Sequence, residues 1–226
     1  MSDFSFDAAS TAVADDFTGA VMPSMKRKVP VNVDLVFVVD RTGSSAAFAK
    51  GIRRAIPMIA RTVLDKAARV RLFLQTHGDL DYGQRPIMVV RDGNFDELTR
   101  EVERVVFEGG GDAPEHHTHA LETLLDNVDW GGARPYSRAV VLFTTADTKP
   151  SPSGRSAAQV AEALLANDVK LFAVCEMESG MKALIERAQS QSFAISNDPS
   201  EAEMQGIGRA VGASVTASLV DTAQLS

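Results

Sequence analysis

The stretch that most constrains the fold of this chain is an apolar run that leads directly into oxygen-bearing side chains. Leu35 to Val39 is long enough for a strand buried on both faces, as strands are in the middle of a parallel sheet. The run ends at Asp40, and Thr42 and Ser44 follow, alternating with residues that need not face a ligand. Open α/β sheets bind ligands at the carboxyl ends of their strands. We therefore expect one carboxylate and two hydroxyls to point at a common site.

Two interpretations fit this Asp-x-Thr-x-Ser pattern. Hard oxygen donors of this kind suit Mg²⁺, Mn²⁺ or Ca²⁺. The same residue types also cap helices in ordinary strand-to-helix loops. The pattern alone leaves both interpretations open.

The rest of the chain alternates between strand-like and helix-like segments, as βαβ units do. The polar connection between the second and third strands is too short for a crossover helix, so the third strand is expected to be an antiparallel edge. The expected strands lie at about 33–39, 70–75, 87–90, 139–143, 169–174 and 192–195. The expected helices lie at about 45–66, from 94, from Pro114, and at 154–166, 181–189 and 201–220.

A second loop carries the more specific motif, Gly109-Gly110-Gly111-Asp112-Ala113-Pro114-Glu115. Glycines let a backbone approach an ion closely, and Pro114 suits the first turn of a following helix. Together the two loops resemble the von Willebrand factor A (vWA) family, in its intracellular bacterial form, over about residues 31 to 220. The resemblance implies a Rossmann-like three-layer α/β sandwich. Its mostly parallel six-stranded sheet would have the spatial order 3-2-1-4-5-6, with strand 3 antiparallel.

The resemblance also implies a MIDAS-type metal site, assembled from three loops. Asp40, Thr42 and Ser44 would come from the first loop and Asp112 from the second. Thr42 and Ser44 would bind the ion directly, while Asp40 would act through water. The expected ion is Mg²⁺, with Mn²⁺ or Ca²⁺ as alternatives.

The third loop departs from the family pattern. Members usually place Asp directly after a Thr at the end of the fourth strand, and here Thr145 occupies that position. Asp147 lies two residues further on and would reach the ion if the loop bends inward. Otherwise a hydroxyl replaces a charge, and the ion is held less tightly.

The function implied by the resemblance is binding of a protein partner, whose Asp or Glu would complete the coordination of the ion. The protein is expected not to be an enzyme but an adaptor or scaffold in a multiprotein complex, with an AAA+ ATPase or in stress or defence. One alternative is a Mg²⁺-dependent hydrolase on a Rossmann-like fold, for which Lys149 is the only candidate base or phosphate-binding lysine near the strand ends. The other is a vWA scaffold with a degenerate metal site.

Two further polar groups lie near the expected site. Asp79 and Asp81 follow the second strand, and we expect them to be solvated loop residues. His116, His117 and His119 form a dense cluster in a chain with four histidines. His116 and His119 could share a helix face with Glu115, which leaves Zn²⁺ as an alternative, although no fourth ligand is evident.

Composition excludes several other classes of protein. A formal net charge of -7 argues against a nucleic-acid surface. No apolar run is long enough to span a membrane, and Cys175 has no second cysteine with which to form a disulfide. The acidic residues near the N-terminus favour a cytoplasmic protein. Residues 1–28 are interpreted as a flexible arm that can contact a partner, and residues 29–226 as the vWA-like domain.

Overall fold

A computed structural model of the chain describes residues 29–111, 113–132, 136–175, 179–194 and 200–224. The predicted N-terminal arm, residues 1–28, and the predicted ligand Asp112 lie outside the described residues.

The described strands form one six-stranded sheet with the order β3-β2-β1-β4-β5-β6. Strand β3 pairs with β2 in antiparallel orientation, and the other neighbours are parallel. The predicted strand order and the antiparallel edge are therefore confirmed. The strands are β1 (Val29–Asp40), β2 (Ala67–His77), β3 (Ile87–Gly93), β4 (Tyr136–Phe143), β5 (Val169–Cys175) and β6 (Gln191–Ala194).

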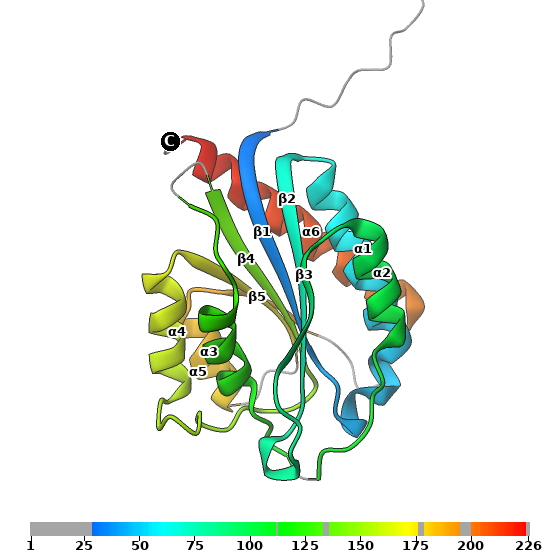
Figure 1. Cartoon of the computed structure of the whole chain (residues 1–226), viewed down its shortest axis with the longest axis vertical. Helices are drawn as coiled ribbons and strands as arrows, with labels where there is room; N and C mark the ends of the chain where they lie inside the picture. Colours follow the sequence, from blue (N-terminus) through cyan, green and yellow to red (C-terminus); the bar gives the residue numbers. More distant parts are fainter. Residues whose placement is uncertain (1–28, 112, 133–135, 176–178, 195–199, 225–226) are drawn as a thin grey trace, which may run out of the picture.

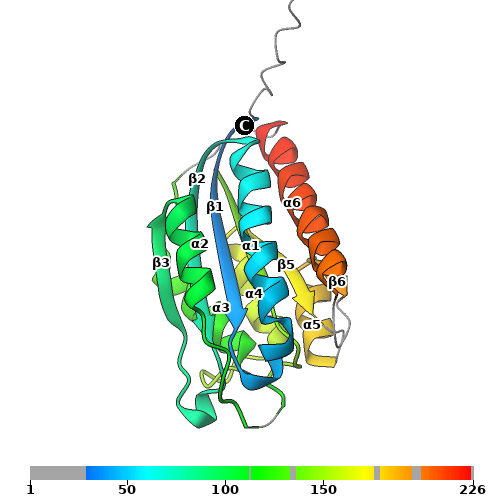
Figure 2. The ribbon, with the colours of Figure 1, turned by 90° about the vertical axis from the view of Figure 1, so that its right-hand side faces the viewer.

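Helices cover both faces of the sheet (Figures 1 and 2). Helices α1, α2 and α6 lie on one face, and α3, α4 and α5 lie on the other. Two short 3-10 turns, η1 (Gly43–Phe48) and η2 (Leu80–Tyr82), follow β1 and β2. The helices are α1 (Ala49–Leu64), α2 (Phe95–Arg104), α3 (His117–Asn127), α4 (Ala157–Ala166), α5 (Ser179–Arg187) and α6 (Glu201–Gln224).

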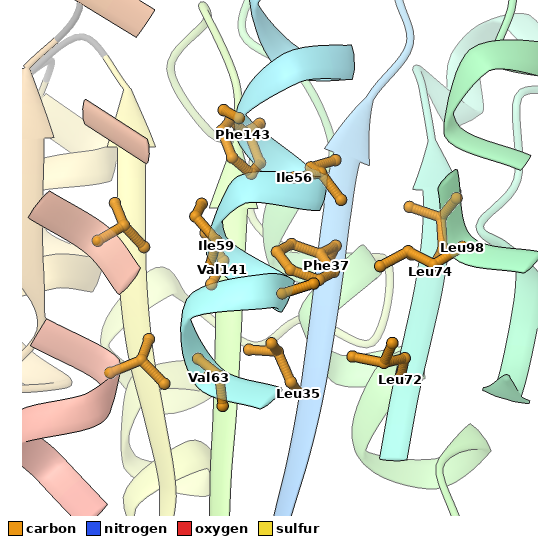
Figure 3. Close-up of a cluster of buried hydrophobic side chains, with 14 of the residues drawn as sticks. Leu35, Phe37, Ile56, Ile59, Val63, Leu72, Leu74, Leu98, Val141 and Phe143 are labelled. Atoms are coloured by element: carbon orange, nitrogen blue, oxygen red, sulfur yellow. The ribbon is translucent and has the colours of Figure 1, made fainter. Parts of the chain in front are cut away.

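The apolar run in β1 is buried on both faces, as its composition indicates. Leu35 and Phe37 pack with residues of α1 such as Ile56 on one face (Figure 3). Val36 and Val38 pack on the opposite face with residues of α3 and α4. Because successive side chains of a strand point to opposite faces, only a continuous apolar run can satisfy both cores.

Three predicted helix starts differ from the structure. The helix expected from about residue 154 begins at Ala157, after the N-cap Ser156. The helix expected from residue 45 begins with the 3-10 turn η1, and α1 starts only at Ala49. The helix expected from Pro114 begins at His117. The backbone of Glu115 is bonded instead to the loop after β4, because its N–H donates to Asp147 and its carbonyl accepts from Lys149.

The order of the strands determines where a ligand site is expected in this sheet. After β1 the chain moves to β2 on one side, and β4 lies on the other side of β1. The carboxyl ends of β1 and β4 are therefore a topological switch point, where the loops that follow the strands diverge. These loops lie at the bottom of Figure 1, away from the end of the molecule where β1 starts and α6 ends.

Within the sheet, in the amino-terminal half of β1, a buried ion pair joins β1 to β2. The carboxylate of Asp34 is fully buried and accepts two hydrogen bonds from Arg71, at 2.7 and 2.9 Å. The N–H of Gly131 donates to the same carboxylate at 2.7 Å. The hydrogen bonds that Arg71 donates to Asp34 raise the pKa of Arg71, so the guanidinium stays charged.

Replacing Arg71 should leave a buried carboxylate without its countercharge. We expect Arg71→Leu to lower the free energy of unfolding by about 3–5 kcal/mol, as measured by urea denaturation. Arg69→Leu, at an exposed position on the same strand, is the control and should change the free energy by less than about 0.5 kcal/mol. Equal losses of stability in the two variants would show that the ion pair between Arg71 and Asp34 does not stabilise the fold.

Candidate metal centre

The carboxylate of Asp40 is buried at the end of β1 and is surrounded by hydroxyl groups. Its Oδ1 accepts hydrogen bonds from the N–H of Thr42 at 2.9 Å and from the hydroxyl of Thr42 at 2.7 Å. Its Oδ2 accepts from the hydroxyl of Thr144, at the end of β4, at 3.0 Å. Both oxygens of a fully buried carboxylate are thus supplied with donors from two loops.

Thr42 and Ser44 are brought together as the sequence predicts. Their hydroxyl oxygens lie 3.0 Å apart. The hydroxyl of Thr145 lies 3.5 Å from that of Ser44 and 3.2 Å from that of Ser45. A Thr from the third loop therefore stands beside the first loop, at the position where the sequence pattern lacks its Asp.

Asp147 is engaged elsewhere. Its Oδ1 accepts from the N–H groups of Thr148 and Met181 at 2.9 and 2.8 Å, and its Oδ2 accepts from the N–H of Gly180 at 3.0 Å. These contacts place the carboxylate at the amino end of α5, where exposed N–H groups favour a negative charge. Asp147 would have to give up these bonds to become an ion ligand.

The glycine loop packs directly on the first loop. The N–H of Gly43 donates to the carbonyl of Gly109, and the N–H of Glu108 donates to the carbonyl of Arg41, each at 2.9 Å. A Cβ on Gly110 would lie 3.1 Å from Cβ of Thr42 and 3.2 Å from Oε1 of Glu115. Gly110 also has a φ of +73°, which a residue with a side chain rarely adopts. Glycine is therefore required where this loop meets Thr42.

The polar residues that follow β2 form a second group beside the first. Asp79, expected to be solvated, is fully buried, so that prediction is wrong. Its carboxylate contacts Nδ1 of His116 at 2.8 Å and Nζ of Lys149 at 3.1 Å, and Lys149 also contacts Asp81 at 2.7 Å. Within the described part of the chain, Asp79, Asp81 and His116 could hold a metal ion, since one ligand atom from each lies within 4.8 Å of the others.

A glutamine that sequence reasoning missed connects the two groups. The side-chain oxygen of Gln84 accepts from the N–H groups of Asp79 and Gly110 at 3.1 and 3.0 Å. Its amide nitrogen donates to the carbonyl of Glu108 at 2.8 Å. No motif signals this role, because the contacts with Gly110 and Glu108 join segments that are far apart in the sequence.

Two buried histidines lie behind Asp40, and their roles also were not predicted. Nε2 of His117 lies 2.8 Å from the hydroxyl of Thr144, and its Nδ1 lies 3.4 Å from Nε2 of His77. His116 pairs with Asp79, and His119 lies near Thr123 and Ser151. The three neighbouring histidines thus have three different surroundings, and the structure does not gather them into a common site.

Burial sets the charge of these groups. It lowers the pKa of His77 to about 3 and also lowers the pKa of His117, so both rings are neutral near pH 7. Burial alone would raise the pKa of Asp40, but the two histidines and the hydrogen bonds from Thr42 hold it below its ordinary value. The histidines act on this pKa only in acid, where their rings carry charge. Near pH 7 the rings are neutral, and the hydrogen bonds from Thr42 and Thr144 stabilise the charged carboxylate.

Removing the carboxylate of Asp147 should weaken the start of α5. We expect Asp147→Ala to lower the free energy of unfolding by about 1–2 kcal/mol. Asp147→Asn, which keeps one acceptor oxygen, should lose less. Urea denaturation measures the free energy of unfolding of both variants. A value for Asp147→Ala equal to that of wild type would show that this cap does not stabilise the fold.

Stability should fall in acid because of His77. Unfolded chains bind the histidine proton near pH 6.5, whereas the folded protein does so only near pH 3. The free energy of unfolding contributed by this group is fully present above pH 6.5 and is lost as the pH falls, by up to about 1.4 kcal/mol per pH unit. Urea denaturation from pH 7.5 to 4.5 should give a shallower pH dependence for His77→Gln. An equal pH dependence of the free energy of unfolding in wild type and His77→Gln would contradict this role of His77.

Comparison with known proteins identifies the fold. No family model and no curated protein matches the chain. Proximal thread matrix protein 1 from the mussel byssus, in a structure with a zinc-occupied MIDAS motif, matches at 14% identity and a TM-score of 0.60. The match covers 84% of this chain and 47% of the mussel protein, so the chain spans about half the length of that relative.

The SpRpn10 VWA domain matches at 10% identity and a TM-score of 0.60. This match covers 78% of the present chain and 93% of that domain. Identities this low establish the fold alone. The chain therefore has the mixed six-stranded α/β sandwich of a von Willebrand factor A domain.

Proposed function

We propose that this protein is a metal-ion-dependent protein-binding module with a MIDAS-type site. The observation that carries the proposal is the convergence of the oxygens of Asp40, Thr42 and Ser44 at the switch point between β1 and β4. Asp112 belongs to the proposed ligand set through the vWA sequence pattern. We leave Asp147 out, because its carboxylate is bonded to the start of α5.

The donor set suits a hard divalent cation. The hydroxyl hydrogen of Thr42 is directed at Asp40, so the lone pairs of Thr42 are open to an ion. The hydroxyls of Ser44 and Thr145 add oxygen donors of the same kind. Such donors favour Mg²⁺, Mn²⁺ or Ca²⁺, and a bound ion would supply the positive charge that attracts a carboxylate of the partner.

A partner carboxylate has a specific role in this site. Where vWA proteins usually place an Asp in the third loop, this chain places Thr145, so the site has one carboxylate fewer. An Asp or Glu of the partner would restore that charge and strengthen ion binding. Ion and partner would then bind cooperatively, each raising the affinity for the other.

The wider role proposed is that of an adaptor or scaffold without catalytic activity, which works with an AAA+ ATPase or with proteins of stress or defence complexes. This extension rests on analogy with vWA proteins. Lys149, the lysine that a hydrolase would need, is held by Asp79 and Asp81, which gives that alternative no support. All helices within the described residues are too short or too polar to cross a lipid bilayer.

The group of Asp79, Asp81 and His116 is a second candidate position for an ion. The ammonium of Lys149 already lies against both carboxylates there and supplies their countercharge. An ion would have to displace Lys149 from Asp79, which is fully buried. The Asp40 site is the better candidate because its carboxylate has hydroxyl and amide donors but no cationic side chain in hydrogen-bond contact among those described.

Calorimetric titration of EDTA-treated protein with Mn²⁺ and Mg²⁺ tests the proposal. We expect one saturable site, with affinity about 10- to 100-fold weaker in Asp40→Asn, because this carboxylate orients the ligand hydroxyls. Asp81→Asn, in the second group, is the matched control and should bind as wild type. Loss of binding in Asp81→Asn alone would move the site to the second group, and absence of binding in wild type would indicate a degenerate site.

The role of the partner carboxylate can be tested with the same protein. Propionate carries the carboxylate of an Asp or Glu side chain without the rest of a partner. Titration of Mn²⁺ in the presence of propionate should give a higher ion affinity than in chloride at equal ionic strength. An equal affinity would contradict an open coordination position for a carboxylate.

A further inference from the structure

The hydroxyl of Thr144 stands between Asp40 and a buried histidine. Its oxygen lies 3.0 Å from Oδ2 of Asp40 and 2.8 Å from Nε2 of His117. All three residues are at least nine-tenths buried, so water does not compete for these contacts. The donor in each of these hydrogen bonds can therefore be assigned from what the three side chains can donate and accept.

The direction of the bond from Thr144 follows from what each group can donate. A hydroxyl has one hydrogen, and an ionised carboxylate can only accept. If Thr144 donated to His117, Oδ2 of the buried Asp40 would lose this donor. The hydrogen of Thr144 is therefore directed at Asp40, and Nε2 of His117 must carry the hydrogen of the second bond.

A carbonyl provides independent support for this assignment. Nε2 of His117 also lies 3.1 Å from the carbonyl oxygen of Ala146. A carbonyl oxygen can only accept, so a bare nitrogen at this distance would bring two lone pairs together. A hydrogen on Nε2 satisfies both Ala146 and Thr144.

The other ring nitrogen of His117 is held by His77. In a neutral ring with its hydrogen on Nε2, Nδ1 is an acceptor. Nε2 of His77 lies 3.4 Å from this atom, and the two rings are nearly perpendicular. His77 therefore donates to His117, His117 to Thr144, and Thr144 to Asp40.

We infer that His117 is a positioning residue for the ion site, acting through Thr144 to hold the carboxylate of Asp40 in place. The inference rests on the proposed function, because Asp40 is a member of the ligand set proposed there. A carboxylate held on both oxygens keeps one orientation toward the hydroxyl of Thr42. The N–H of Ala146 also donates to the hydroxyl oxygen of Thr144, at 3.2 Å. Without the shorter bond from His117 this backbone donor alone holds the oxygen, and the hydroxyl is directed less firmly at Oδ2 of Asp40.

Matched substitutions separate this role from simple packing. In Mn²⁺ titrations we expect Thr144→Val to weaken binding about 10-fold and Thr144→Ser to retain it, because only Val lacks the hydroxyl. His117→Gln keeps an N–H near the Nε2 position and should bind as wild type. His117→Leu should weaken binding about 10-fold. In a Thr144→Val background, His117→Leu should cost no further affinity.

Folding of each variant is checked by circular dichroism and thermal unfolding. If His117→Leu does not fold, the pair Thr144→Val and Thr144→Ser carries the test. Binding as in wild type by folded His117→Leu or by Thr144→Val would overturn the inference. So would an equal loss in the Gln and Leu variants of His117, which would indicate packing alone.

Nitrogen-15 NMR of the histidine rings gives a readout that needs no ion. In the metal-free protein near pH 7 we expect His117 to carry its hydrogen on Nε2 and none on Nδ1. A hydrogen on Nδ1 overturns the inference. If wild type binds neither Mn²⁺ nor Mg²⁺, the proposed function fails, and the spectrum still decides whether His117 directs its donor at Thr144.

Discussion

The buried carboxylate of Asp40 is the group on which the arrangement of the loops depends. A charge at the end of a central strand is costly to bury unless both of its oxygens accept hydrogen bonds. Thr42, in the loop after β1, donates two hydrogen bonds to Oδ1, and Thr144, in the loop after β4, donates one to Oδ2. The two parallel strands are thereby joined at the switch point, where the fold favours a ligand.

The loops around Asp40 form one connected framework rather than separate surface turns. The glycine loop bonds through its backbone to the first loop, and Glu115 bonds through its backbone to the third. Gln84 joins the segment after β2 to the glycine loop, and Lys149 crosses from the third loop to Asp79. A substitution in one loop is therefore expected to affect the others, whether or not it contacts an ion.

The sequence predicts much of the fold because the strands have a clear signal. The apolar run of β1, buried on both faces, and the short connection before β3 were sufficient for a central parallel strand and an antiparallel edge. The predicted helix starts at residues 45 and 114 differ from the observed starts at Ala49 and His117. A local pattern does not show that the backbone of Glu115 forms hydrogen bonds with the loop after β4. Because of these tertiary bonds the helix begins after Glu115, although Pro114 favours a helix start at its own position.

The sequence by itself determined the class of fold and the nearness of Asp40, Thr42 and Ser44, because these residues share one strand and the turn after it. Only the tertiary structure decided what surrounds them. It buries Asp79, turns Asp147 to the start of α5, and places His117 behind Thr144. Each of these outcomes depends on which segments meet across the end of the sheet, and residue types in a linear pattern do not specify that meeting.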